Sequence, residues 1–142
     1  MSNNEVQPDP VANDRPAIWP IVIENVAATF ACNDSVAALL VADMSERHRV
    51  GCERYGMPLQ AGNGRDALVD AYQEALDLCA YMRQAHEEGA GGVYAIYLQA
   101  LRTAFDIRRV IATRDRDNAG SPFSSPSVHQ EIAAEMIRKV RP

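Results

Sequence analysis

Cysteine is scarce in this sequence of 142 residues, and the cysteines present form no recognisable framework. Cys32, Cys52 and Cys79 are odd in number, widely spaced and outside any C-x-x-C or Cys/His zinc pattern. This spacing argues against a disulfide-stapled domain and against a zinc site. Reduced thiols in a cytoplasmic protein are the favoured interpretation.

Long hydrophobic runs, a basic start and a surplus of positive charge are also missing. No stretch of about 18 apolar residues occurs, and the N-terminus is polar and proline-rich, so neither a membrane span nor a signal peptide is predicted. The net charge of -5 argues against general nucleic-acid binding, because phosphate backbones are held by basic surfaces. An acidic protein can still bind a nucleotide when a metal ion bridges the two negative partners.

Aromatic residues make up only 6% of the chain, whereas 47% of it is hydrophobic. This composition is typical of a helical protein, and the length predicts one domain. Apolar spacing and cap residues predict an all-α bundle of four to five helices. We expect a flexible arm over 1–16, a helical domain over 17–115 and a loop with a C-terminal helix over 116–142. The expected helices are 19–30, 35–55, a third from a cap at Asn63 to Gly89, then 93–113 and 128–140.

Carboxylates gather on one face of the third predicted helix. At about 100° per residue, five side chains fall within roughly 80° of one another. They are Asp66, Asp70, Glu74, Asp77 and Tyr81. Like charges at this spacing destabilise a helix by a few tenths of a kcal/mol per pair unless a cation neutralises them. A row of basic side chains or a metal ion can supply that cation.

The preceding helix carries a second acidic set. Glu46 and Glu53 lie two turns apart on one face, and Asp43 lies one turn before Glu46. Apolar residues share this face, and carboxylates in such a setting need a partner. If the two helices pack antiparallel, both sets can converge on a hard cation, Mg²⁺ or Mn²⁺.

Basic and polar residues flank the loop between these helices and are candidates for substrate binding. Arg54 and Arg65 are suited to phosphate oxygens, Tyr55 to stacking on a base or sugar, and Asn63 to reading a base edge. Each has a structural alternative. Arg65 can pair with Asp66 or Asp70, Tyr55 can belong to the core, and Asn63 can be a helix cap.

The order of these motifs resembles the MazG-type all-α nucleoside triphosphate pyrophosphohydrolases. That superfamily uses an E-x-x-E pair on one helix and an E-x-x-D pair on the next. Glu74 and Asp77 match the second pair, and the nearest equivalents of the first are Asp43 and Glu46, with Glu53 a heptad further on. The runs over residues 53–59, 63–66 and 70–77 look like the phage-encoded branch, whose members include the MazZ-type dGTP/dATP diphosphohydrolases. The resemblance covers roughly residues 35–88.

The resemblance implies a specific activity. A purine deoxynucleoside triphosphate, dGTP or dATP, would be attacked at the α-phosphorus and converted to the monophosphate and pyrophosphate. The expected ligands of Mg²⁺ or Mn²⁺ are Asp43, Glu46, Glu53, Asp70, Glu74 and Asp77, and Glu46 or Glu53 would act as the general base. Members of the superfamily form dimers or tetramers, so we expect self-association, and a phage-encoded chain would work in the host cytoplasm.

Two other classes of protein remain as alternatives. A carboxylate-bridged di-iron bundle requires Glu-x-x-His pairs, which this sequence lacks. A small helical interaction protein needs no site at all, because its acidic stripe would be solvated surface.

Overall fold

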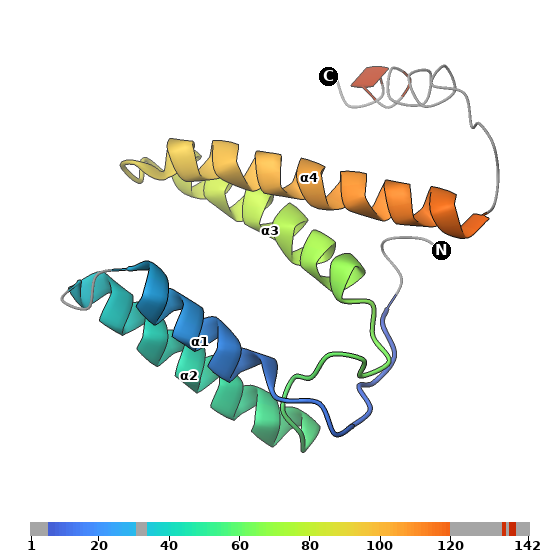
Figure 1. The fold of residues 1–142 in the computed structure, drawn as a ribbon. Coiled ribbons are helices and arrows are strands. Elements are labelled where there is room, and N and C mark those ends of the chain that lie inside the picture. Colours follow the sequence, from blue (N-terminus) through green and yellow to red (C-terminus); the bar gives the residue numbers. More distant parts are fainter. Residues whose placement is uncertain (1–5, 31–33, 120–134, 136, 139–142) are drawn as a thin grey trace. The chain divides into compact units, whose positions relative to one another are not determined.

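The computed structural model describes residues 6–30, 34–119, 135, 137 and 138 (Figure 1). Its helices are α1 (Ile18–Thr29), α2 (Ser35–Tyr55), α3 (Ala67–Glu87) and α4 (Val93–Ala119). Apart from an isolated bridge between Ala17 and Gln60, these residues contain no β-structure, which confirms the predicted all-α class. The helix predicted over 128–140 lies outside the described residues except at 135, 137 and 138.

The chain forms two compact units, Met1–Asp70 and Ala71–Pro142. The boundary falls at the end of the first turn of α3. None of the helices described here combines the length and the apolar character that crossing a membrane requires.

In the first unit, α1 and α2 lie side by side as a hairpin (Figure 1). The bounds predicted for α2 are confirmed, and its ends have clear causes. The side chain of Asp34 accepts a hydrogen bond of 2.8 Å from the backbone N–H of Val36, and Gly56 ends the helix with a left-handed φ of 68°. Pro20 lies in the first turn of α1, where its missing N–H leaves no helical bond unmade.

The start of α3 differs from the expectation. Asn63 was predicted as the cap, but Asp66 takes that role, accepting bonds from the backbone N–H groups of Leu68 (3.1 Å) and Val69 (3.3 Å). The loop extends past Asn63 because Gly64, with a φ of 86°, adopts a backbone conformation that a helix does not use. Asp70 therefore lies in the first turn of α3, near the positive end of the helix dipole.

In the second unit, α3 and α4 run side by side around a short turn (Figure 1). The ring centroids of His86 and Tyr94 are 5.0 Å apart, and the guanidinium of Arg83 lies 5.8 Å from the ring centroid of Tyr97. The helix α4 has 27 residues and extends beyond the predicted end at 113. Only Ile111 among the larger side chains described is fully buried.

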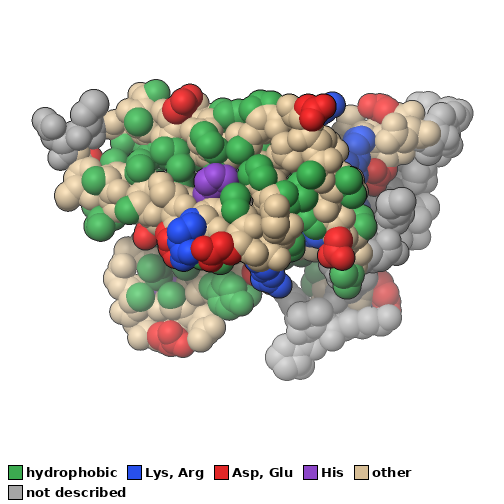
Figure 2. All heavy atoms as spheres, turned by 90° about the horizontal axis from the view of Figure 1, so that it is seen from below, with side chains coloured by type: hydrophobic (Ala, Val, Ile, Leu, Met, Phe, Trp, Pro, Cys, Tyr) green, Lys and Arg blue, Asp and Glu red, His purple; other side chains and the backbone are tan. Residues whose placement is uncertain are grey.

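Many apolar side chains remain at the surface (Figure 2). On α4 the exposed set is Tyr94, Ile96, Leu98, Leu101, Phe105 and Val110. Of these, Tyr94, Leu98, Leu101 and Phe105 follow a spacing of four, three and four residues, which places them on one stripe of the helix.

The N-terminal segment, for which the sequence predicts a flexible arm, is hydrogen-bonded to the loop after α2. Gln60, buried to 9% exposure, donates from Nε2 to the carbonyls of Asn13 (2.7 Å) and Arg15 and accepts from the N–H of Asn13 (3.2 Å). The backbone N–H of Val11 donates to the carbonyl of Asn63 at 2.8 Å. One buried amide thus satisfies three backbone groups of the arm, which would otherwise lose their partner.

We expect Gln60→Ala to lower the free energy of unfolding by about 1–3 kcal/mol, because it removes a buried amide and leaves its backbone partners unsatisfied. Urea unfolding measures the loss, and hydrogen exchange at the Asn13 amide locates it. Gln99→Ala, at an exposed position on α4, is the control and should change stability by less than about 0.5 kcal/mol. Equal effects from both variants would contradict the role of Gln60.

Candidate functional site

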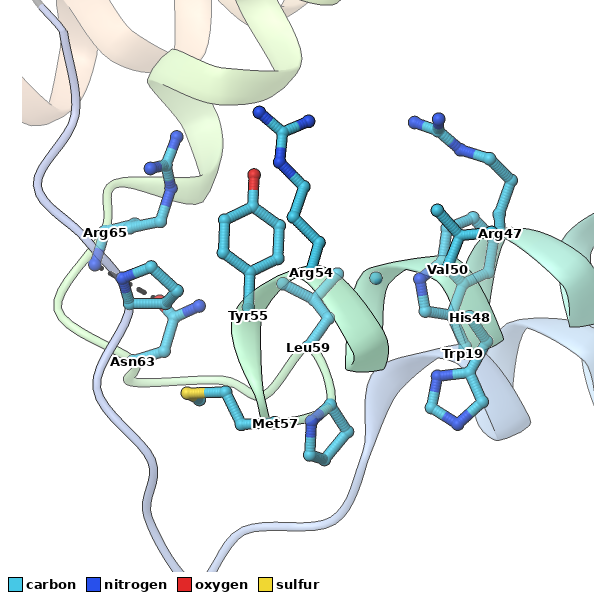
Figure 3. Close-up of a pocket in the computed structure, with 13 residues that line it drawn as sticks. Trp19, Arg47, His48, Val50, Arg54, Tyr55, Met57, Leu59, Asn63 and Arg65 are labelled. Atoms are coloured by element: carbon cyan, nitrogen blue, oxygen red, sulfur yellow. Dashed lines mark hydrogen bonds between the residues drawn. The ribbon is translucent and has the colours of Figure 1, made fainter.

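The first unit contains a pocket between α2, the loop that follows it, the start of α1 and the N-terminal arm (Figure 3). Its volume is about 270 Å³. The lining residues are Pro10, Trp19, Arg47, His48, Val50, Gly51, Arg54, Tyr55, Met57, Pro58, Leu59, Asn63 and Arg65. None of these is an Asp or a Glu. The lining therefore combines three guanidinium groups with aromatic side chains.

All four residues predicted to contact substrate line this pocket. The guanidinium of Arg54 lies 5.4 Å from the ring centroid of Tyr55, within the range of a cation–π interaction. Asn63, 5% exposed, accepts a hydrogen bond of 3.1 Å from the backbone N–H of Arg65. The structure brings Arg54, Tyr55, Asn63 and Arg65 to one cavity, and their contact with a ligand stays a prediction.

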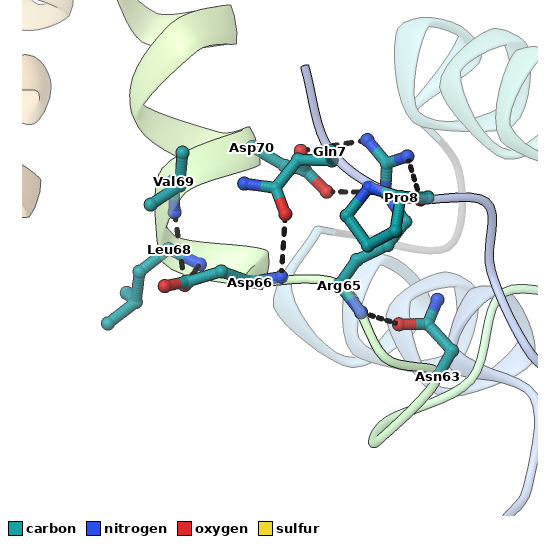
Figure 4. A network of polar contacts seen from close by, with 8 residues as sticks. All are labelled: Gln7, Pro8, Asn63, Arg65, Asp66, Leu68, Val69 and Asp70. Carbon is teal, nitrogen blue, oxygen red and sulfur yellow. Dashed lines mark hydrogen bonds and ion pairs between the residues drawn. The ribbon is translucent and has the colours of Figure 1, made fainter. Parts of the chain in front are cut away.

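Arg65 ties three segments of the first unit together (Figure 4). Its Nε and Nη2 donate to the two carboxylate oxygens of Asp70, both at 2.9 Å, and its Nη1 donates to the carbonyl of Pro8 at 2.9 Å. The bond to Asp70 raises the pKa of Arg65. Of the two predicted partners, Asp70 is the one that forms this two-bond ion pair. The Asp70 carboxylate thus neutralises an arginine, although the sequence predicted it as a metal ligand.

The other two arginines of the pocket differ from Arg65. Among the residues that the structure describes, no carboxylate pairs with Arg47 or Arg54. Figure 3 shows both side chains extending to the same side of α2 as the Tyr55 hydroxyl. Two uncompensated guanidinium groups in one cavity create a positive potential that favours an anion.

Glu46 and Glu53 do not line this pocket and instead bind Arg49. The Nε and Nη2 of Arg49 donate to the two oxygens of Glu46 at 2.8 and 2.6 Å, and its Nη1 donates to Glu53. All three side chains are more than half exposed. Hydrogen bonding from Arg49 lowers the pKa of Glu46.

The predicted metal ligands are not gathered within either unit. Asp43 is exposed on α2, and Glu74 and Asp77 are exposed on α3 in the second unit. Over the described ranges, no group of three or more His, Cys, Asp or Glu side chains is arranged to hold a metal ion. A bound Mg²⁺ or Mn²⁺ stays a prediction.

Nine of the lining residues were not among the predicted substrate contacts, and Trp19, Arg47 and His48 are the three of these with an aromatic or basic side chain. Trp19 lies on α1, and Arg47 and His48 lie almost two turns before the end of α2. For Arg47 a signal existed, because positions 47, 50, 51 and 54 share one helical face at about 100° per residue. For Trp19 none existed, since only the packing of α1 on α2 places it at the pocket.

Comparison of the chain with protein-family models, with curated proteins and with solved structures finds no match. The resemblance to MazG-type enzymes therefore stays a prediction that rests on the quoted motifs.

We expect Arg49→Gln to raise the pKa of Glu46 toward its ordinary value, because the variant removes the guanidinium that stabilises the carboxylate. In the native protein a lowered pKa contributes stability above the ordinary carboxyl pKa, and the contribution is lost as pH falls through the lowered value. Carbon-detected NMR titration of the Glu46 carboxyl measures the change. Arg102→Gln, which removes the ion pair with Asp106 on α4, is the matched control and should leave Glu46 unchanged.

Proposed function

We propose that the pocket of the first unit binds a nucleoside triphosphate. We further propose that the protein is a nucleoside triphosphate pyrophosphohydrolase acting on a purine deoxynucleotide, dGTP or dATP. In this reaction water attacks the α-phosphorus, the bond from the α-phosphorus to the bridging oxygen breaks, and pyrophosphate leaves with the nucleoside monophosphate as the second product. The reaction and the purine preference come from the resemblance to MazG-type enzymes.

The observation that carries the binding proposal is the charge of the pocket lining. Arg47 and Arg54 face the cavity without a carboxylate partner in the described part of the chain, and none of the residues lining it is acidic. Guanidinium groups bind phosphate oxygens through parallel hydrogen bonds. Tyr55 and Trp19 add flat apolar surfaces of the kind that a nucleobase requires.

Of the four predicted metal ligands in the first unit, Asp43 is exposed on α2 and the other three are bonded to guanidinium groups. Glu46 and Glu53 share Arg49, and both oxygens of Asp70 accept bonds from Arg65. A metal ion would have to displace these guanidinium groups or share the carboxylate oxygens with them. We therefore assign no step of the reaction to a bound metal. The pyrophosphate-release assay described below, run with and without Mg²⁺ or Mn²⁺, measures the metal dependence.

A second candidate function is that of a helical interaction protein without catalysis. The apolar stripe on α4 favours it, because Tyr94, Leu98, Leu101 and Phe105 are each more than 40% exposed. Exposed apolar stripes of this kind mark protein contact surfaces. A partner helix or a second copy of the chain would bury them.

A pyrophosphate-release assay over the common ribo- and deoxynucleoside triphosphates, with Mg²⁺, with Mn²⁺ and with neither, separates the two functions. We expect release from dGTP or dATP. Nucleotide binding without release would leave a binding module, and the absence of both would overturn the proposal.

We expect Arg47→Ala and Arg54→Ala each to weaken nucleoside triphosphate binding about tenfold or more, because each removes a charge-assisted hydrogen bond worth about 1.5–3 kcal/mol. Arg49→Ala is the matched control, since Arg49 lies on the same helix, is already paired with two glutamates and does not line the pocket. Calorimetric titration measures the affinities. Equal losses in all three variants would show that only the net charge of the protein matters.

The resemblance implies that Glu46 or Glu53 is the general base, in which case Glu46→Gln or Glu53→Gln abolishes pyrophosphate release while the helical content is kept. Because both glutamates are paired with Arg49 and neither lines the pocket, the geometry favours the opposite result, activity retained in both variants. Circular dichroism checks the fold, and single-turnover kinetics check the chemistry. Full activity in both variants would refute the assignment of the base to this pair.

A further inference from the structure

We infer that Trp19 is the surface on which the nucleobase stacks, and that it makes the pocket prefer a nucleotide over a bare polyphosphate. This inference rests on the proposed function and deepens it by assigning the specificity for the base. The sequence suggests Tyr55 as the stacking residue, but the surroundings of the two rings make Trp19 the better candidate.

The residues that line the pocket are spread along it, with aromatic and basic side chains at different ends. In Figure 3, Trp19 lies with Arg47 at one end, Arg65 lies at the opposite end, and Arg54 and Tyr55 lie between them. A nucleotide whose base rests on Trp19 would have Arg47 at the same end, and its phosphate chain would extend along the pocket toward Arg54.

Of the two aromatic side chains, Trp19 has the freer ring. The guanidinium of Arg54 already lies over the ring of Tyr55, at 5.4 Å from its centroid. In the described segments no other ring and no guanidinium stacks on Trp19. The indole is also the larger of the two surfaces. Stacking of one base on an aromatic side chain contributes about fivefold to a hundredfold in affinity.

The backbone holds Trp19 in place at the pocket. The N–H of Ile18 donates to the carbonyl of Leu59 at 2.9 Å, which joins the first turn of α1 to the loop that lines the pocket. A stacking surface fixed in advance loses little entropy when a ligand binds.

The test compares dGTP with inorganic tripolyphosphate, which has the phosphates but no base. Trp19 is the only tryptophan of the chain, so its selective excitation reports on this position alone. We expect dGTP to quench the emission and tripolyphosphate to change it little. In calorimetry, Trp19→Ala should weaken dGTP binding about tenfold or more and tripolyphosphate binding less than about twofold. Trp19→Phe should retain most of the affinity, and Tyr55→Ala should have the smaller effect on dGTP.

The outcomes separate the inference from the function on which it rests. Equal losses for the two ligands, no loss in Trp19→Ala, or a larger loss in Tyr55→Ala would each overturn the role of Trp19 while phosphate binding survives. Failure of the wild-type protein to bind either ligand would overturn the proposed function itself. If circular dichroism shows that Trp19→Ala loses helical content, the role of Trp19 is judged from the Trp19→Phe variant and from quenching of the wild-type emission. In that case two results count against stacking. One is strong quenching of the wild-type emission by tripolyphosphate, and the other is a Trp19→Phe variant that loses as much affinity for dGTP as for tripolyphosphate.

Discussion

The first unit depends on one planar group, the guanidinium of Arg65, because it joins segments far apart in the sequence. Two of its nitrogens bind both oxygens of Asp70 in the first turn of α3, and a third binds the carbonyl of Pro8 in the arm. The side chains of Arg65 and Asp70 are about 30% exposed, so water screens their attraction less than at the open surface. A lysine could not replace this arginine, since a single ammonium offers no rigid fork of donors.

The distribution of charge along α2 explains how an acidic protein acquires a positive pocket. Glu46 and Glu53 lie three residues before and four residues after Arg49, and this spacing brings all three together on one face. The pocket face of the helix carries Arg47 and Arg54, for which the described residues offer no carboxylate. Local pairing thus removes the negative charge from the side of the helix where an anion would bind, although the net charge of the chain is -5.

The sequence predicted the helices well because their signals are local. The cap at Asp34 and the left-handed glycine at Gly56 set the bounds of α2, and the expected range of 35–55 is confirmed. The predicted start of α3 was wrong, because the choice between Asn63 and Asp66 as the cap depends on where the preceding loop turns. The sequence also pointed to Arg54, Tyr55, Asn63 and Arg65, which are close in sequence around one loop.

The contribution of Trp19 and the pairing of Asp70 were harder to foresee. Trp19 reaches the pocket through the packing of α1 on α2, a contact between segments about 30 residues apart that no periodicity encodes. The pair of Arg65 and Asp70 was one of two partnerships that the sequence allowed. Choosing between them required the position of the first turn of α3.

A stripe of carboxylates on a helix is ambiguous because two different cations give the same sequence pattern. A metal ion and an arginine both relieve the repulsion between acids one or two turns apart. The arginine has a local signature, however, since it must itself stand three or four residues from each acid. Arg49 meets that condition for Glu46 and Glu53, whereas no lysine or arginine stands three or four residues from Glu74 or from Asp77. The acids of α2 are therefore explained by ion pairs within their own helix. Glu74 and Asp77 have no such arginine, so a metal ion remains the hypothesis for that part of the acidic pattern.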